Sequence, residues 1–269
     1  MLKYEKITFR MKFSIITICF NSKKTIEKTL KSVLAQTYSN YEYLIVDGLS
    51  NDGTLDIIKE YEPLFDGRMK WVSEPDKGIY DAMNKGVVKA KGEIIGIVNS
   101  DDWLEPETLA IIENLATTYG TSNVVYTGNI RYIYNDGSNQ IIRRTKTEMG
   151  RYCKRYEMAL NHPATFIPKK VYEQFGLYDT NLKLQADCDL INRLYRKDVG
   201  FVFVDKVLSN QSDGGASTKS YYQSLKDYNY ILHKNGVRGI SYYLLSWRYR
   251  TKKMIKRFMP QKLLVNHRR

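Results

Sequence analysis

Short apolar runs and amphipathic segments alternate along the first 120 residues of the chain. The apolar runs have the length of strands and cover residues 14–20, 43–46, 69–72 and 93–98. Apolar positions recur at helical spacing in residues 26–34, 55–61, 79–90 and 106–115. Apolar strands that are separated by helices are typical of a parallel sheet. The pattern therefore predicts an α/β fold with a mostly parallel sheet flanked by helices.

The second half of the chain is less regular. Strands are expected at residues 124–134, 140–145, 165–167 and 201–208, and helices at residues 187–195 and 220–234. Residues 212–218 have the composition of a flexible loop. We expect one α/β domain over residues 1–239, with a mixed second half, followed by a C-terminal amphipathic helical extension over residues 240–269.

The composition is globular, but the charge is unusual. The 269 residues include 42 Lys and Arg against 29 Asp and Glu, which gives a net charge of +13. Such a basic chain suggests nucleic acid, an anionic membrane or a polyanionic substrate as its partner. The three cysteines, Cys19, Cys153 and Cys188, are too few and too scattered for a disulfide framework or a zinc site. This favours a reducing environment.

Much of the excess charge lies at one end of the chain. Residues 240–269 carry nine positive charges and no acidic residue, interleaved with Trp, Tyr and Leu side chains. This predicts an amphipathic helix that ends at Pro260 and lies on an anionic membrane surface. A helix packed on the domain and a solvated tail are the alternatives. Because no nucleic-acid recognition motif accompanies the charge, we expect no nucleic-acid partner.

The N-terminus has no apolar segment of the signal-peptide kind, and no apolar run reaches the length of a membrane-spanning helix. The first ten residues, which precede Met11, are interpreted as a leader without structural weight. We therefore expect a cytoplasmic protein that is peripheral on the inner face of the cell membrane.

Acidic residues gather near the ends of the predicted strands. Asp47 ends the second strand, Asp76 lies in the loop before the third helix, and Asp101 and Asp102 close the fourth strand. In a parallel sheet these ends form the ligand-binding edge. The adjacent carboxylates of Asp101 and Asp102 favour a divalent cation, Mg²⁺ or Mn²⁺, beside a phosphate-bearing ligand. As alternatives, this pair caps the following helix and Asp47 is a turn residue.

Five segments carry a family resemblance. They read SIITICFN, AQTY, YEYLIVDGLSNDGT, EPDKGIYDAMNKG and EIIGIVNSDDWLEP. The series resembles the inverting glycosyltransferases of family 2, which have the GT-A fold, and most of all the bacterial members that build surface polysaccharides. The resemblance covers roughly residues 12–215. It implies transfer of a sugar from a nucleotide-sugar donor, with a UDP-sugar expected, to a lipid-linked oligosaccharide or glycan.

The resemblance also implies roles for residues on the nucleotide side. Thr17 and Asn21 would line the nucleotide pocket, and Asp47 would accept a hydrogen bond from the uracil N3–H. Asp76 and Lys77 would belong to the loop that closes over the base and the phosphates.

The SDD sequence at residues 100–102 resembles the metal motif of the family. By this resemblance Asp101 would contact the ribose and Asp102 would bind the divalent cation, Mg²⁺ or Mn²⁺. Met83 stands where many relatives have arginine, which leaves Lys77 or another cation to face the diphosphate.

Inverting transfer needs a carboxylate that takes the proton of the acceptor hydroxyl. The segment QADCDLINRL resembles the ED-x-D-L segment of the family, with Asp187 at the position of the base and Ala186 where relatives carry glutamate. The structural alternative for Asp187 is a carboxylate favoured by the helix dipole. His162 is a further candidate near the acceptor, and Gly214-Gly215 resembles a loop that closes over the donor.

A sugar-phosphate nucleotidyltransferase is the alternative enzyme class. That class needs a glycine-rich phosphate loop after the first strand. Here the strand is followed by Asn21-Ser22-Lys23-Lys24, which contains no glycine, so the sequence disfavours this alternative.

Overall fold

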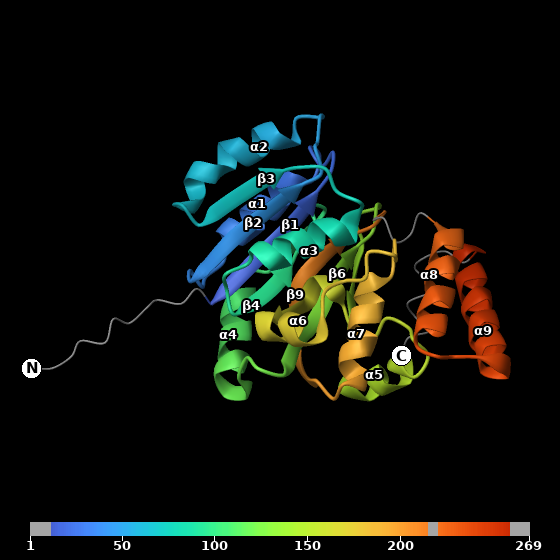
Figure 1. Ribbon diagram of the computed structural model, residues 1–269. Coiled ribbons are helices and arrows are strands. Elements are labelled where there is room, and N and C mark those ends of the chain that lie inside the picture. The colour runs from blue at the N-terminus through green and yellow to red at the C-terminus, as the bar shows by residue number, and fades with distance from the viewer. Residues whose placement is uncertain (1–11, 215–219, 259–269) are drawn as a thin grey trace, which may run out of the picture.

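The computed structural model describes residues 12–214 and 220–258, with side chains up to residue 255. Nine strands in these residues form one sheet (Figure 1). They are β1 Phe13–Cys19, β2 Tyr41–Asp47, β3 Met69–Ser73, β4 Ile94–Ile97, β5 Asp102–Leu104, β6 Val124–Ile133, β7 Asn139–Ile142, β8 Thr165–Pro168 and β9 Gly200–Ser212. The order is β3-β2-β1-β4-β8-β6-β9-β5, and β7 pairs with β6.

The two halves of the sheet differ in strand direction. Strands β3, β2, β1 and β4 are parallel, whereas β8 is antiparallel to both β4 and β6. Strand β9 is parallel to β6, and the short β5 is antiparallel to β9. The expected α/β fold, with a mostly parallel sheet and a mixed second half, is confirmed.

Helices cover both faces of the sheet (Figure 1). They are α1 Ile26–Leu34, α2 Thr54–Tyr61, α3 Ile79–Lys89, α4 Thr108–Tyr119, α5 Lys146–Cys153, α6 Lys169–Phe175, α7 Ala186–Arg196, α8 Tyr221–Lys234 and α9 Gly239–Phe258, with short 3₁₀ turns η1 Glu62–Phe65 and η2 His162–Ala164. Because side chains alternate across a strand, Ile16 of β1 packs with α3 and Ile15 packs with α1. A Cβ at Gly86 of α3 would lie 2.5 Å from Ile16, so glycine allows this close approach.

The sequence did not predict α5, α6 or β5. The expected strand at 140–145 ends at Ile142, because Thr145 caps α5 and accepts a hydrogen bond from the Glu148 amide at 3.3 Å. Strand β5 has three residues and forms only by pairing with the distant β9. Asp102 therefore begins a strand, and α4 begins later at Thr108, so the helix-capping alternative for the acidic pair is wrong.

Helices α8 and α9 form a pair at one end of the molecule (Figure 1). The rings of Tyr228 and Tyr249 stack with their centroids 3.9 Å apart. The buried carboxylate of Glu157 forms ion pairs with Arg248 and Lys252 of α9. One face of α9 therefore packs on the domain, and two of the nine positive charges of residues 240–269 are paired there.

Among the described helices, none is both long and apolar enough to cross a membrane. The predicted leader, most of the loop at 212–218 with Gly215, and the helix end at Pro260 lie outside the described residues. The domain boundary at residue 239 stays a prediction.

Candidate active site

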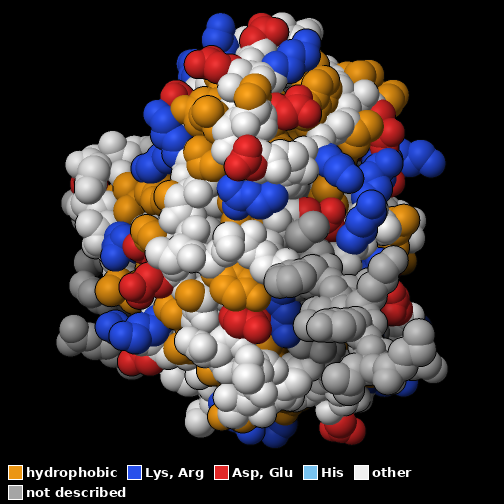
Figure 2. Space-filling model, turned by 90° about the vertical axis from the view of Figure 1, so that its left-hand side faces the viewer, with side chains coloured by type: hydrophobic (Ala, Val, Ile, Leu, Met, Phe, Trp, Pro, Cys, Tyr) orange, Lys and Arg blue, Asp and Glu red, His pale blue; other side chains and the backbone are white. Residues whose placement is uncertain are grey.

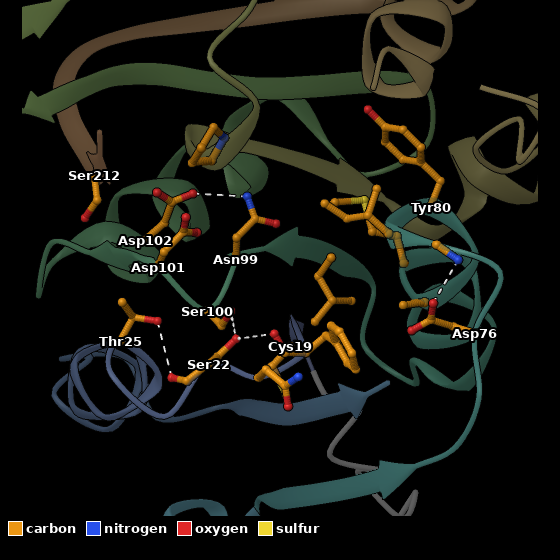
Figure 3. Close-up of a pocket in the computed structure, with 18 of the residues that line it drawn as sticks. Cys19, Ser22, Thr25, Asp76, Tyr80, Asn99, Ser100, Asp101, Asp102 and Ser212 are labelled. Atoms are coloured by element: carbon orange, nitrogen blue, oxygen red, sulfur yellow. Dashed lines mark hydrogen bonds between the residues drawn. The ribbon is translucent and has the colours of Figure 1, made fainter. Parts of the chain in front are cut away.

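A cavity of about 760 Å³ opens at the carboxyl ends of β1 and β4, beside the first turns of α3 and α7 (Figure 3). Figure 3 shows Asp101 and Asp102 at one side of the cavity and Asp76 and Tyr80 at the other. Five of the eight predicted site residues line it, namely Asn21, Asp76, Asp101, Asp102 and Asp187. Asn21 and Asp187, which are 166 positions apart in the chain, thus line the same cavity.

Asp102 is a buried carboxylate that has no basic partner among the described residues. It is 2% exposed, and it accepts hydrogen bonds from the Asn99 side-chain amide at 3.1 Å and from the Ser212 backbone. Burial and the neighbouring charge of Asp101 raise the pKa of Asp102 well above its ordinary value. The buried Oδ1 of Asn99 also lacks a partner among the described groups. A buried carboxylate without a counter-charge is a fitting environment for a hard cation.

Asn21 holds together two loops at the rim of the cavity. Its backbone lies in the left-handed region, with φ of 50°, which asparagine tolerates better than most residues. Its side-chain oxygen accepts a hydrogen bond from the backbone amide of Asn51 at 3.0 Å. Its backbone amide donates to the hydroxyl of Ser50 at 2.8 Å. Asn21 thus lines the cavity as predicted and also fixes the loop after β2.

Thr17 and Asp47 lie behind the cavity and do not line it. Thr17 is fully buried, and its hydroxyl accepts a hydrogen bond from Tyr43 at 2.9 Å. The following residues, Ile18 and Cys19, lie at the carboxyl end of β1 and line the cavity instead.

The carboxylate of Asp47 is fully buried and already engaged. It accepts the hydroxyls of Ser50 at 2.5 Å and Ser73 at 2.7 Å, and the Ser50 amide at 2.9 Å. The structure therefore does not place Asp47 to accept the uracil N3–H, nor Thr17 to line the nucleotide pocket. Asp47 instead ties the loop after β2 to the end of β3, which is close to the turn role that the sequence left open.

The carboxylate of Asp76 occupies space beside the loop after β2. Its Oδ1 accepts the amide of Gly78 at 2.8 Å. Its Oδ2 lies 2.5 Å from the point where a Cβ on Gly48 would be, and the ring of Phe20 lies 3.5 Å from the same point. The absence of a side chain at Gly48 therefore allows Asp76 to approach, and Asp76 and Phe20 both line the cavity.

Lys77 is exposed and lies outside the cavity lining. Its backbone carbonyl accepts the ammonium of Lys183 at 3.4 Å. Lys183 and Lys24 do line the cavity. These two lysines are therefore candidates for the other cation that the sequence left open beside Lys77, and they gave no signal because isolated lysines are usually solvated.

Asp187 lies in the first turn of α7, where the helix dipole favours a carboxylate. Its Oδ1 accepts two hydrogen bonds, from the Tyr80 hydroxyl at 3.0 Å and from the Cys188 amide at 2.8 Å. Tyr80 belongs to the first turn of α3, 107 residues earlier in the chain. The sequence gave no signal for this contact, since Tyr80 is one of 22 tyrosines.

His162 lines the same side of the cavity. Its Nε2 and the Tyr178 hydroxyl lie 3.1 Å apart. Burial lowers the pKa of His162, and the nearby charge of Asp187 only partly opposes this. Asn84 holds the Tyr178 backbone with two hydrogen bonds, at 2.9 Å and 3.0 Å.

The segment before Asp187 is attached to the C-terminal helices. The amides of Lys183 and Leu184 both donate to Asp227 of α8, at 2.9 Å and 2.6 Å. The side-chain amide of Gln185 donates to the Tyr249 hydroxyl of α9 at 3.0 Å. Helices α8 and α9 therefore support the loop that carries Lys183 and Asp187 to the cavity.

Comparison with known proteins identifies the family. Residues 14–176 match the family model described as glycosyl transferase family 2. The chain belongs to this family. An uncharacterized glycosyltransferase of Mycobacterium tuberculosis is 30% identical over 183 residues, which are 67% of each chain. A PGL/p-HBAD biosynthesis glycosyltransferase of Mycobacterium bovis is 30% identical over 188 residues, 68% of this glycosyltransferase and 69% of that protein.

Solved structures share the fold of this glycosyltransferase. A fragment of S. aureus TarS, in complex with UDP-GlcNAc, has a TM-score of 0.67 at 21% identity. The similarity covers 83% of this chain but only 65% of that fragment, which is less than two thirds. A mannosyltransferase from Pyrobaculum calidifontis, in complex with GDP-Man and Mn²⁺, has a TM-score of 0.64 at 15% identity, covering 87% of this chain and 66% of that one. The GT-A fold and the transferase class predicted from the sequence are confirmed.

Proposed function

We propose that this enzyme is an inverting glycosyltransferase that moves a sugar from a UDP-sugar to a lipid-linked glycan in cell-surface polysaccharide synthesis. One observation carries the proposal: the buried, cation-deficient Asp102 and the hydrogen-bonded Asp187 line the same cavity. A cation held at Asp102 would stabilise the leaving diphosphate, and the carboxylate of Asp187 would take the proton of the acceptor hydroxyl. The relatives named for PGL/p-HBAD biosynthesis and the TarS complex with UDP-GlcNAc support this class of reaction.

For the donor, we infer that Asp76 takes the contact with the base that the sequence assigned to Asp47. Its carboxylate lines the cavity next to Phe20, whereas the Asp47 carboxylate is occupied by Ser50 and Ser73. A carboxylate accepts the N3–H of uracil and has no donor for the N3 of cytosine. At the other side, Asp101 stays the candidate for the ribose hydroxyls.

A divalent cation, Mg²⁺ or Mn²⁺, fits the residues around Asp102. Burial and the neighbouring charge of Asp101 raise the pKa of Asp102, and a cation bound to this carboxylate would oppose both effects. The described residues contain no cluster of three or more histidine, cysteine or acidic residues that would bind a metal unaided. This agrees with an ion that shares its coordination with the substrate phosphates and water. When bound, the cation supplies positive charge to the leaving diphosphate.

In the proposed reaction the acceptor oxygen attacks the anomeric carbon from the side opposite the nucleotide. The bond between that carbon and the diphosphate oxygen breaks as the new glycosidic bond forms. Asp187 takes the proton from the acceptor hydroxyl, and the diphosphate leaves with the bonding electron pair. Lys24 and Lys183 line the cavity and place two positive charges within its reach.

A donor panel tests the proposal. Release of nucleotide is measured from UDP-, GDP- and dTDP-sugars, with Mn²⁺, with Mg²⁺ and with EDTA. We expect one UDP-sugar to be preferred and release to stop in EDTA. Formation of an NDP-sugar and pyrophosphate from a sugar 1-phosphate and an NTP should be absent. Release of pyrophosphate in that assay would favour the nucleotidyltransferase alternative. Retention of configuration in the product would overturn the inverting mechanism.

We also propose that α9 contacts an anionic membrane at the cytoplasmic face, where a lipid-linked acceptor is confined. Six large apolar side chains of this helix are 51–78% exposed, namely Ile240, Tyr243, Leu244, Trp247, Met254 and Ile255. Their spacing of three, four and seven residues places them on one stripe, away from the face where Tyr249 is buried.

Charge favours an anionic bilayer as the occupant of this stripe. Arg250 of α9 is exposed, and the residues beyond position 258 add further positive charges in sequence. At the end of the molecule away from α8 and α9, acidic and basic side chains are intermixed (Figure 2).

A further inference from the structure

The carboxylate of Asp187 is held by only one of its two oxygens. Both of its hydrogen bonds within the described residues, from the Tyr80 hydroxyl and the Cys188 amide, end on Oδ1. A carboxylate fixed at one oxygen keeps its plane and presents the other oxygen, Oδ2, for proton transfer. The Cys188 amide belongs to the helix itself, so the tyrosine is the side chain that orients the carboxylate.

Tyr80 is itself held rigidly. It is 6% exposed and its ring stacks on Tyr178, with centroids 5.7 Å apart. The ring of Tyr178 in turn faces His162, and its backbone is fixed by Asn84. Tyr80 also follows the Asp76 loop directly, because α3 begins at Ile79. The same turn of helix therefore connects the nucleotide side of the cavity to the base.

We propose that Tyr80 is a positioning residue for the transfer reaction, whose hydroxyl fixes Oδ1 of Asp187 and so directs Oδ2 toward the acceptor hydroxyl. This inference rests on the proposed function, in which Asp187 is the base.

The groups around Asp187 leave Tyr80 free to donate its proton to the carboxylate. The titratable groups that face Asp187 are Tyr80 from α3, His162 from η2, Tyr178 from the loop before α7, and Cys188 from its own helix. Burial raises the pKa of Tyr80, Tyr178 and Cys188 and lowers that of His162. All four are therefore uncharged near pH 7, and Tyr80 keeps the hydroxyl proton that it donates to Oδ1 of Asp187.

Tyr80→Phe is the direct test, with nucleotide release from the preferred sugar of the donor panel as the assay. We expect kcat to fall by roughly 10- to 100-fold with KM for the donor changed by less than about threefold. Tyr172→Phe is the matched control: it removes a buried hydroxyl that bonds to Tyr178 at 3.0 Å without touching Asp187, and its kcat should stay close to that of the wild type.

Two further measurements separate positioning from a structural role. Rates are expressed per UDP-binding site, which removes any unfolded fraction. The double variant Tyr80→Phe/Asp187→Asn should be no slower than Asp187→Asn, because both changes act on one group. An unchanged kcat in Tyr80→Phe, or additive losses in the double variant, would overturn the role of Tyr80. Normal turnover of Asp187→Asn would instead overturn the proposed function, so the two failures are distinguishable.

Discussion

The proposed function divides the site residues into two groups that are built in different ways: a nucleotide side, with Asn21, Asp76 and Asp101, and an acceptor side around Asp187. The residues of the proposed nucleotide side each stand at or near the end of a parallel strand, and neighbouring loops hold Asn21 and Asp76. On the proposed acceptor side, the supports come from Tyr80, Asp227 and Tyr249, which lie on three separate helices. The nucleotide side is therefore a local product of the sheet, whereas the acceptor side depends on tertiary packing of the C-terminal helices.

The largest expected effect separates the chemistry of the two sides. Asp187→Asn should lower kcat by about 10³-fold, the range for losing a general base, while UDP binding stays within about twofold. Asp102→Asn should instead abolish the dependence of UDP binding on Mn²⁺. Isothermal titration with UDP and Mn²⁺, beside turnover assays, checks both. If the two variants lost the same step, the division between base and leaving-group sides would be wrong.

The next effect concerns how the acceptor side is held together. Burial disfavours the Glu157 carboxylate, but Lys252 and Arg248 outweigh it and keep its pKa below the ordinary 4.5. This ion-pair stabilisation is present above pH 4.5 and is lost as the pH falls through the lowered pKa. Glu157→Gln should cost about 2 kcal/mol of unfolding free energy at pH 7, reduced from the fully buried case because both cations are partly exposed.

Urea unfolding at pH 7 and pH 3.5 measures this contribution. The difference between the wild type and Glu157→Gln should shrink at the lower pH, because Glu157 of the unfolded chain takes up a proton below its ordinary pKa of 4.5 while the lowered pKa of the folded protein resists it. Glu148→Gln, which breaks a surface pair with Arg151, is the control and should change little at either pH. A constant difference across the two pH values would show that the ion pairs do not stabilise the C-terminal helices.

A smaller effect tests the nucleotide side. Asp76→Asn should raise KM for the UDP-sugar by about tenfold, the loss of one charge-assisted hydrogen bond, and should improve inhibition by CDP relative to UDP. Asp47→Asn should lower the melting temperature, because it breaks the bonds from Ser50 and Ser73, but should leave the ratio of UDP to CDP inhibition unchanged. The reverse pattern would show that Asp47, and not Asp76, contacts the uracil of the donor.

The smallest effect is expected at the outer face of α9. Leu244→Glu/Trp247→Glu should weaken flotation with vesicles of phosphatidylglycerol and phosphatidylcholine by about fivefold. Nucleotide release from the donor with water as acceptor should stay unchanged, because these side chains are exposed and point away from Gln185. Tyr119→Glu on α4 is the control, since Tyr119 is also 59% exposed. Equal flotation of all three proteins would refute the membrane contact.

The sequence predicted the nucleotide side better than the acceptor side for a physical reason. Strands β1 to β4 are consecutive and local, so their ends and the acidic residues after them could be located from periodicity. Even there, the sequence did not show that Thr17 lies too early in β1 to line the cavity, and the internal bonds of Asp47 gave no signal. Tyr80 and Lys183 were missed because their roles arise only from contacts across more than 100 residues.

The hydrogen bond from Gln185 to Tyr249 bears on how variants of this enzyme can be assembled. A chimera designed to change acceptor preference could exchange α8 and α9 alone between two relatives. Such an exchange would separate Tyr249 and Asp227 from the loop that they support. The unit of exchange is therefore residues 183–187 together with both helices. Removal of the C-terminal helix would likewise alter the geometry of Asp187, and truncation is a poor way to isolate the contribution of the membrane.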